Sequence, residues 1–403
     1  MKSFEVEALL NVAAQVLQLA FPLLLIFVAS IYLDNASFLD LAAVTYWLAI
    51  QTTVIGFGFD TVVTKDIAEA KRADLSELFS LVVYFQIIIW LFLLFVLAGY
   101  ASYVDVFPSS FAVAIVSAAG YAIGPPWLAM ALGLNNRVLV FGLIVRVVGL
   151  SVIIICPRDI VFYYLVFVVV ALATSMKIFA SAVQDELLIT DRNQLRQIVL
   201  IFAAKLRPLS YSFFAKLSVA AYTTAIPLGV SQYTELAAAK AFVVADKLKN
   251  IINYGMGAVL PVFNRFYLDP VIKSPKLMFY YIFGLTILIA LNFLIWFAAP
   301  TILMALNVNG ENAQQILTLM CLSVIPIYLT NYFGLLNIFM KGYMKTYLLP
   351  LAFAGIFALV NIDVVLNYFG TFGVALMSLS IEVIILIVFI GFHVYYRRLR
   401  FRD

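Results

Sequence analysis

Long apolar segments recur along the whole chain, and they constrain its fold more than any other feature. A bilayer core of about 30 Å is crossed by roughly 20 consecutive, mostly apolar helical residues. The chain has twelve such stretches, near residues 8–30, 38–59, 79–99, 110–133, 137–156, 161–182, 209–229, 236–260, 278–299, 313–336, 347–367 and 372–394. The sequence therefore predicts an all-α membrane protein with about twelve transmembrane helices.

Composition supports the same assignment. The chain is 65% hydrophobic and only 11% charged, whereas a soluble domain is about 45–50% apolar and roughly 25% charged. This much apolar surface cannot be buried in one water-soluble core, so lipid must cover a large part of it. The first apolar stretch does not fit a cleavable signal, because Glu5 and Glu7 stand where a basic region belongs.

Several function classes have no support in the sequence. Cys156, Cys321 and the single histidine, His393, lie far apart and show no metal-ligand spacing. We therefore expect no metal and no cofactor, and we interpret both cysteines as packing residues. Nucleic acid is not an expected partner, because the basic residues are scattered between apolar runs rather than gathered on one face.

The basic residues set the orientation of the spans, because cytoplasmic connections of membrane proteins are enriched in Lys and Arg. With the N-terminus in the cytoplasm, eighteen of the 25 Lys and Arg residues fall in cytoplasmic segments, and only Arg158 falls in an outer loop. The cytoplasmic residues are Lys2, Lys65, Lys71, Arg72, Arg137, Arg192, Arg196, Lys205, Arg207, Arg265, Lys273, Lys276, Lys341, Lys345, Arg397, Arg398, Arg400 and Arg402. The bias predicts an even number of spans with both termini cytoplasmic.

A polar interval near residues 183–208 divides the chain into two halves. We predict an N-terminal lobe, 1–195, with six helices, and a C-terminal lobe, 196–403, with six helices and a basic tail. The segment SFLDLAA at 37–43 is similar to QYTELAA at 232–238, which favours parallel repeats related by a pseudo-twofold axis along the membrane normal. The interval itself fits an amphipathic helix on the membrane surface or a simple extension of the seventh span.

Ionisable residues inside the spans are the main functional signal, since they are costly in lipid and face a cavity or a partner by default. In the span 236–260, Asp246, Lys247, Lys249 and Asn250 share one half of the helix circumference with other polar residues. Asp246 and Lys249 can pair at i,i+3, whereas Lys247 has no acid three or four positions away. We therefore predict that Lys247 contacts an anion.

Other polar residues at membrane depth complete the predicted site. Arg146, Lys216 and Lys240 are expected to add positive potential to the path of the anion. Asn11, Gln15 and Gln18 form a stripe on the first span and, with Asn250, are candidates to line a cavity. Asp60, Asp246 and Glu382 are candidates for ion coupling. Simpler alternatives remain open for these residues, namely snorkelling lysines, ion pairs and polar contacts between helices.

The order of several short motifs resembles that of Wzx-type flippases in the polysaccharide transporter family. The second span ends in GFGFD at 56–60, followed by TKDIA at 64–68 and PWLAMALG at 126–133. The segments IPLG at 226–229, ADK at 245–247 and LP at 260–261 continue the series. The glycine at 133 falls two positions late, and Asp246 stands where the family often has Glu. The motifs cover about residues 10–270, and the remainder resembles the family in topology alone.

The resemblance implies a function. It implies a flippase that moves an undecaprenyl-diphosphate-linked oligosaccharide from the inner to the outer leaflet of a bacterial plasma membrane, by alternating access and ion coupling. Other polysaccharide-assembly membrane proteins and membrane lipid are the implied partners. Two alternatives remain: a multidrug exporter of the same superfamily, and a membrane polymerase or ligase that acts on lipid-linked sugars. The short, nearly uncharged outer loops leave little room for a catalytic site, so we expect a transporter and not an enzyme.

Overall fold

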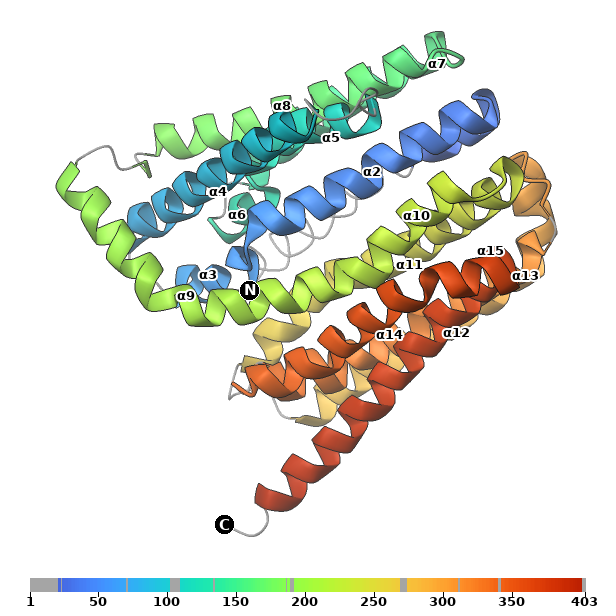
Figure 1. Cartoon of the computed structure of the whole chain (residues 1–403). Helices are drawn as coiled ribbons and strands as arrows, with labels where there is room; N and C mark the ends of the chain where they lie inside the picture. Colours follow the sequence, from blue (N-terminus) through green and yellow to red (C-terminus); the bar gives the residue numbers. More distant parts are fainter. Residues whose placement is uncertain are drawn as a thin grey trace. The chain divides into compact units, whose positions relative to one another are not determined.

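The computed structural model is helical throughout the part of the chain that it describes. It describes residues 21–22, 24–69, 72–101, 109–132, 135–185, 187–188, 192–268, 274–310, 312–339 and 342–400. Within these ranges all regular structure is α-helix or short π-helix, and no strand occurs (Figure 1). The predicted fold class, an all-α protein, is confirmed for these residues.

The helices follow one another through short connections. They are α2 (Asn35–Gly56), α3 (Phe59–Glu69), α4 (Arg72–Ala101), α5 (Ser109–Ile123), α6 (Pro126–Ala131), α7 (Asn135–Ile155), α8 (Ile160–Gln184), α9 (Arg192–Ala220), η1 (Ala221–Ala225), α10 (Ile226–Tyr233), α11 (Leu236–Leu268), α12 (Ser274–Ala305), α13 (Ala313–Leu322), α14 (Val324–Thr330), η2 (Asn331–Phe339) and α15 (Met344–Arg400). The two η elements are π-helices.

Eight helical stretches of the described chain are long and apolar enough to cross a membrane. One of them, Met344–Tyr396, has 53 residues, and α15 is interrupted at Gly370, where the backbone leaves helical geometry (φ 59°). It therefore covers the two last predicted spans. Helix α7 has a shorter apolar part, Val140–Ile155, and α11 is not among the eight. The chain is a multi-pass membrane protein.

The predicted spans and the observed helices agree along most of the chain. Every predicted span from 38–59 onward falls on helical segments, some of them on two or three consecutive helices, such as 110–133 on α5 and α6. Of the first predicted span, residues 24–32 are helical, whereas Asn11, Gln15 and Gln18 lie outside the described residues. The stripe that these three side chains form thus stays a prediction.

The helices pack into two compact units. One consists of Met1–Ala42 and Ala221–Asp403, and the other is Ala43–Ala220. The sequence places a boundary between residues 195 and 196 instead, because the polar interval lies there. The two six-helix lobes and their pseudo-twofold axis stay predictions.

In the unit 43–220, a tight turn joins α2 to α3 and explains the GFGFD motif. Phe57 and Gly58 have positive φ angles of 41° and 77°, a conformation that suits glycine. A Cβ atom on Gly58 would stand 2.8 Å from the carbonyl oxygen of Leu209 and from Cβ of Ser212 on α9. The glycine therefore lets α9 approach the turn, and Phe57 stacks on Phe213 with ring centroids 4.8 Å apart.

Helix α9 decides between the two alternatives for the polar interval. It runs from Arg192 to Ala220 as one helix that contains Pro208, and η1 and α10 follow it directly. The amphipathic segment thus extends the seventh span. Its apolar side enters a core with α3, α4 and α8, in which Phe85 and Phe202 stack with centroids 3.7 Å apart.

In the unit that contains 221–403, α11 lies in the interior. It packs against α10, α12, α13, α14 and α15, and every residue from Ala239 to Lys247 is buried. The sequence places the polar residues of this span on one half of the helix, where a cavity or a partner is expected. In the structure protein covers both halves at this level, because five helical neighbours pack against α11.

Candidate functional site

The charged residues of α11 gather with one acid of α15 inside the same unit. We call Asp246, Lys247, Lys249, Asn250 and Glu382 the α11 charge cluster. Asp246 is 0% exposed, Lys249 is 3%, Glu382 is 4% and Lys247 is 6%. Charges this deeply buried are stable only when they are paired and hydrogen-bonded, so the contacts within the cluster decide its chemistry.

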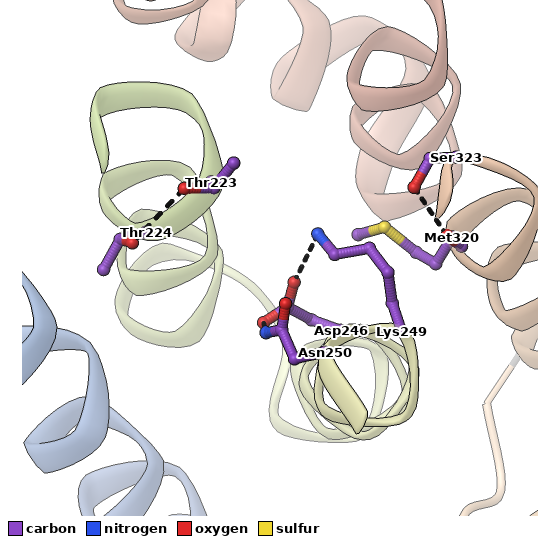
Figure 2. A network of polar contacts seen from close by, with 7 residues as sticks. All are labelled: Thr223, Thr224, Asp246, Lys249, Asn250, Met320 and Ser323. Atoms are coloured by element: carbon purple, nitrogen blue, oxygen red, sulfur yellow. Dashed lines mark hydrogen bonds and ion pairs between the residues drawn. The ribbon is translucent and has the colours of Figure 1, made fainter. Parts of the chain in front are cut away.

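The centre of the cluster is an ion pair on one face of α11. Lys249 Nζ lies 2.8 Å from Asp246 Oδ1, and Asn250 Nδ2 donates a hydrogen bond of 3.0 Å to Asp246 Oδ2 (Figure 2). The i,i+3 and i,i+4 spacings bring these three side chains together. The pairing of Asp246 with Lys249, which the sequence left open, is confirmed.

In the sequence, Lys247 has no acid three or four positions away. In the structure, charged neighbours nevertheless lie near its side chain. Its ammonium lies in the fields of Asp246 and Lys249, and it takes part in interactions within the protein. Asp246 directly precedes Lys247 in the chain, and its carboxylate acts on the ammonium at this short separation. Whether Lys247 also contacts an anion stays a prediction.

Glu382 reaches the cluster from α15. Its carboxyl group hydrogen-bonds the hydroxyl of Tyr222 and lies in the field of Lys249. Tyr222 is carried by η1, one of the π-helical turns, which frequently occur at functional sites. The next two residues, Thr223 and Thr224, place their hydroxyl oxygens 3.5 Å apart on the same turn (Figure 2).

Helix α13 contributes the third side of the cluster. In Figure 2 the side chain of Lys249 extends between Asp246 and the sulfur of Met320, and Ser323 follows at the end of α13. Ser323 Oγ donates a 2.6 Å hydrogen bond to the carbonyl of Met320. The ammonium of Lys249 also lies near the buried thiol of Cys321. Three elements of one unit thus surround the charges of α11.

Lys240 has a different place on the same helix. Its Nζ donates a 2.8 Å hydrogen bond to the carbonyl of Ser30 and lies 5.5 Å from the ring centre of Phe38. Ser30 belongs to the last turn of the helical segment that ends at residue 32, where cations complement the helix dipole. In this structure, Lys240 therefore stabilises a helix end.

Two predicted site residues of the other unit pair with each other. Lys216 of α9 forms an ion pair with Asp60 of α3, and both side chains are about one-third exposed. A second pair, Lys205 with Asp66, joins the same two helices at 2.8 Å. Each charge thus has a counter-ion, and the roles expected for Asp60 in ion coupling and for Lys216 in anion binding stay predictions.

Arg146 lies on α7 and is half-buried. No acidic side chain forms an ion pair with it among the described residues, and its Nε is buried without a hydrogen-bond partner. Thr174 Oγ1, on the adjacent helix α8, is likewise buried and without a partner. Arg146 and Lys216 belong to the unit 43–220, whereas Lys240 and Lys247 belong to the unit with 221–403.

Two residues of these sites have no signal in the sequence. Tyr222 and Thr174 are neutral, and both lie within apolar stretches that resemble every other span. Only the packing of η1 on α15 and of α7 on α8 brings them to the charged side chains. No group of three or more His, Cys, Asp or Glu side chains within the described ranges is arranged to hold a metal ion.

Comparison with known proteins identifies the fold. The structure is similar to an inward-facing multidrug resistance MATE family transporter of the MOP superfamily, with a TM-score of 0.58 and 15% sequence identity over 97% of both chains. A MATE protein in a bent conformation matches with a TM-score of 0.48 and 13% identity, over 98% of this chain and 93% of the other. No protein-family model and no curated protein matches the sequence.

The first of these similarities establishes the fold. At 15% identity over 97% of the chain, the likeness concerns the fold alone and leaves the substrate open. The chain therefore shares the fold of this MATE family transporter.

Proposed function

We propose that this protein is a flippase for an anionic, lipid-linked oligosaccharide. In this proposal it moves an undecaprenyl-diphosphate-linked unit from the inner to the outer leaflet of a bacterial plasma membrane by alternating access. The transporter fold and the motif order from GFGFD to ADK support the proposal.

The observation that carries the proposal is the sign of the buried charge. Within the described chain, the buried Lys, Arg, Asp and Glu side chains are three lysines, Lys240, Lys247 and Lys249, and two acids, Asp246 and Glu382. Arg146 adds a half-buried cation for which no acidic partner is described. An excess of positive charge at low dielectric favours an anionic ligand over a cationic one.

A lipid diphosphate fits this excess chemically. Arg and Lys neutralise phosphate oxygens through charge-assisted hydrogen bonds. Hydroxyl and amide groups such as those of Thr223 and Asn250 can hydrogen-bond the hydroxyl groups of the sugars. The polyprenyl tail needs no polar path, since it can stay in the bilayer. Lys247 is the proposed principal contact, with Arg146, Lys216 and Lys240 adding positive potential.

The experiment is export by Lys247 variants in cells. Truncating one partner of a desolvated charge pair costs about 2–5 kcal/mol, so Lys247→Ala should abolish or greatly weaken surface polysaccharide. Lys247→Arg keeps the charge and should retain part of the export. Each variant must be present in the membrane in normal amounts. Export by Lys247→Ala at the parental level would show that the residue is structural.

A multidrug exporter is the second candidate, and two observations favour it. The matched fold is that of a multidrug resistance transporter, and the buried carboxylates Asp246 and Glu382 are groups that cationic drugs bind. Reconstituted vesicles separate the candidates. A flippase exposes a labelled polyprenyl-diphosphate oligosaccharide on the outer leaflet and leaves a cationic dye where it was. Transport of the dye alone would refute the flippase.

A further inference from the structure

The interface between α7 and α8 contains a second set of polar groups that the α11 charge cluster does not use. Arg146 lies 11 residues from the start of α7 and 9 from its end. At about 1.5 Å per residue this is roughly 14–16 Å from either end, the middle of a bilayer core of about 30 Å. An arginine at this depth is costly, and such residues mark substrate paths by default.

The packing of α7 places Arg146 at the border between protein and lipid. Gly142 and Gly149, each within a helical turn of it, are buried against the protein. Ile144 and Val147, also close to it on the helix, are 56% and 53% exposed. The guanidinium is thus half-buried beside an apolar outer surface, and a group that arrives from the lipid side can reach it.

A glycine makes room for the guanidinium. A Cβ atom on Gly142 would stand 2.6 Å from Arg146 Nη1 and 3.6 Å from Thr174 Cγ2. The arginine side chain therefore folds back over Gly142, toward the α8 side chain that borders the same space. Thr174 is 7% exposed, so its hydroxyl is out of contact with surrounding solvent or lipid.

These groups have hydrogen-bonding capacity that the described residues do not fill. Arg146 Nε and Thr174 Oγ1 are both buried without a hydrogen-bond partner in the described structure. A buried polar atom without a partner is destabilising, so a ligand that supplies the partner binds favourably. The guanidinium and the methyl group of Thr174 border the same space at Gly142, and no described acid pairs with Arg146. A phosphate complements such a cation, because it carries negative charge and several acceptor oxygens.

We propose that Arg146 and Thr174, beside Gly142, form a lipid-side phosphate site between α7 and α8. Its ligand is the diphosphate of the lipid-linked substrate, held at mid-membrane while the tail remains in the bilayer. This inference rests on the proposed function and adds a contact outside the α11 charge cluster. The guanidinium holds two phosphate oxygens, and the Thr174 hydroxyl, which is buried in this structure, donates to a third after its side chain rotates.

Binding of defined lipids to the purified full-length protein tests the site. The probes are a polyprenyl diphosphate without sugar, phosphatidylglycerol and inorganic diphosphate, each followed by native mass spectrometry and by quenching of tryptophan fluorescence. Arg146→Met should weaken binding of polyprenyl diphosphate about 10- to 100-fold, as expected when charge-assisted hydrogen bonds are lost. Thr174→Val, which has nearly the same shape, should weaken it about 2- to 10-fold.

Arg158→Met is the matched control, because it removes the same charge from the exposed connection between the same two helices. It should bind like the parent. If Arg146→Met fails to fold, the test uses Thr174→Val and Gly142→Ala. The new methyl group of Gly142→Ala displaces the guanidinium. The site would be overturned if folded Thr174→Val and Gly142→Ala bind polyprenyl diphosphate with parental affinity, or if the substitutions at Arg146 and Arg158 weaken binding equally.

The three probes separate the sources of the phosphate. Preference for polyprenyl diphosphate over the other two supports the proposal. Equal binding of phosphatidylglycerol overturns the assignment to the substrate, and equal binding of inorganic diphosphate overturns the approach from the lipid side. A failure of the proposed function gives a different result. The reconstituted parent protein then does not flip the oligosaccharide lipid in vesicles, even though it binds polyprenyl diphosphate through Arg146.

Discussion

Replacing Lys249 tests the electrostatics of the α11 charge cluster most directly. In Lys249→Met, an apolar chain of similar length takes the place of an ammonium that is 3% exposed and lies 2.8 Å from a carboxylate that is 0% exposed. The carboxylates of Asp246 and Glu382 then lose the cation that faces both of them. Removing one partner of a buried pair costs about 3–5 kcal/mol, so we expect a loss of stability of that size.

The same geometry predicts an asymmetry and a rescue. Asp246→Asn should cost less than Lys249→Met, because Glu382 still faces the ammonium and the amide keeps the shape of the side chain. The double variant removes both charges of the pair. It should recover most of the stability lost in Lys249→Met, because the desolvation penalty of the pair disappears with its Coulomb energy.

The two cysteines provide the assay. Cys321 is buried in the cluster, and Cys156 can be replaced by Ser to leave a single reporter. Labelling of Cys321 by a thiol-reactive fluorophore across an SDS titration reports the free energy of unfolding. Lys345→Met, the same change at an exposed position of α15, should stay within about 0.5 kcal/mol of the parent. A Lys249→Met protein as stable as this control would refute the reasoning.

Three further predictions follow from particular contacts. Gly58→Ala should destabilise the protein by about 1–3 kcal/mol, because φ is 77° and the new Cβ would press on α9. Gly229→Ala is the control: this glycine lies in a helix and its Cβ would meet nothing within 4 Å, so the change should be neutral or stabilising. Thermal unfolding compares the stability of the two variants. Lys240→Met should lower the free energy of unfolding by about 1.5–3 kcal/mol through the lost hydrogen bond, and unchanged stability with lost export would instead indicate substrate binding. Cysteines at Ser102 and Asn309 should react with an impermeant reagent from the periplasmic side, and labelling from the cytoplasm would reverse the topology.

The sequence by itself determined the fold class and the positions of the spans. In lipid, every backbone group must be satisfied within a helix or a closed barrel, so about 20 apolar residues in a row suffice to locate a span. The i,i+3 pair of Asp246 and Lys249 could also be predicted from the sequence, because the geometry of a single helix brings these two side chains together. These features depend on local structure alone.

The tertiary structure decided which charges are neutralised and by which partners. The ion pair of Lys216 with Asp60, the hydrogen bond from Lys240 to Ser30 and the approach of Glu382 to Lys249 each join residues far apart in the chain. Apolar sequence offers no signal for such partners, because any neighbouring helix can bury a lysine. The proposed site of Arg146 and Thr174 depends on the packing of α7 on α8, which brings the guanidinium and the Thr174 side chain to the same space at Gly142. Hydropathy locates helices in the bilayer, but the side chains that meet between them are fixed by packing.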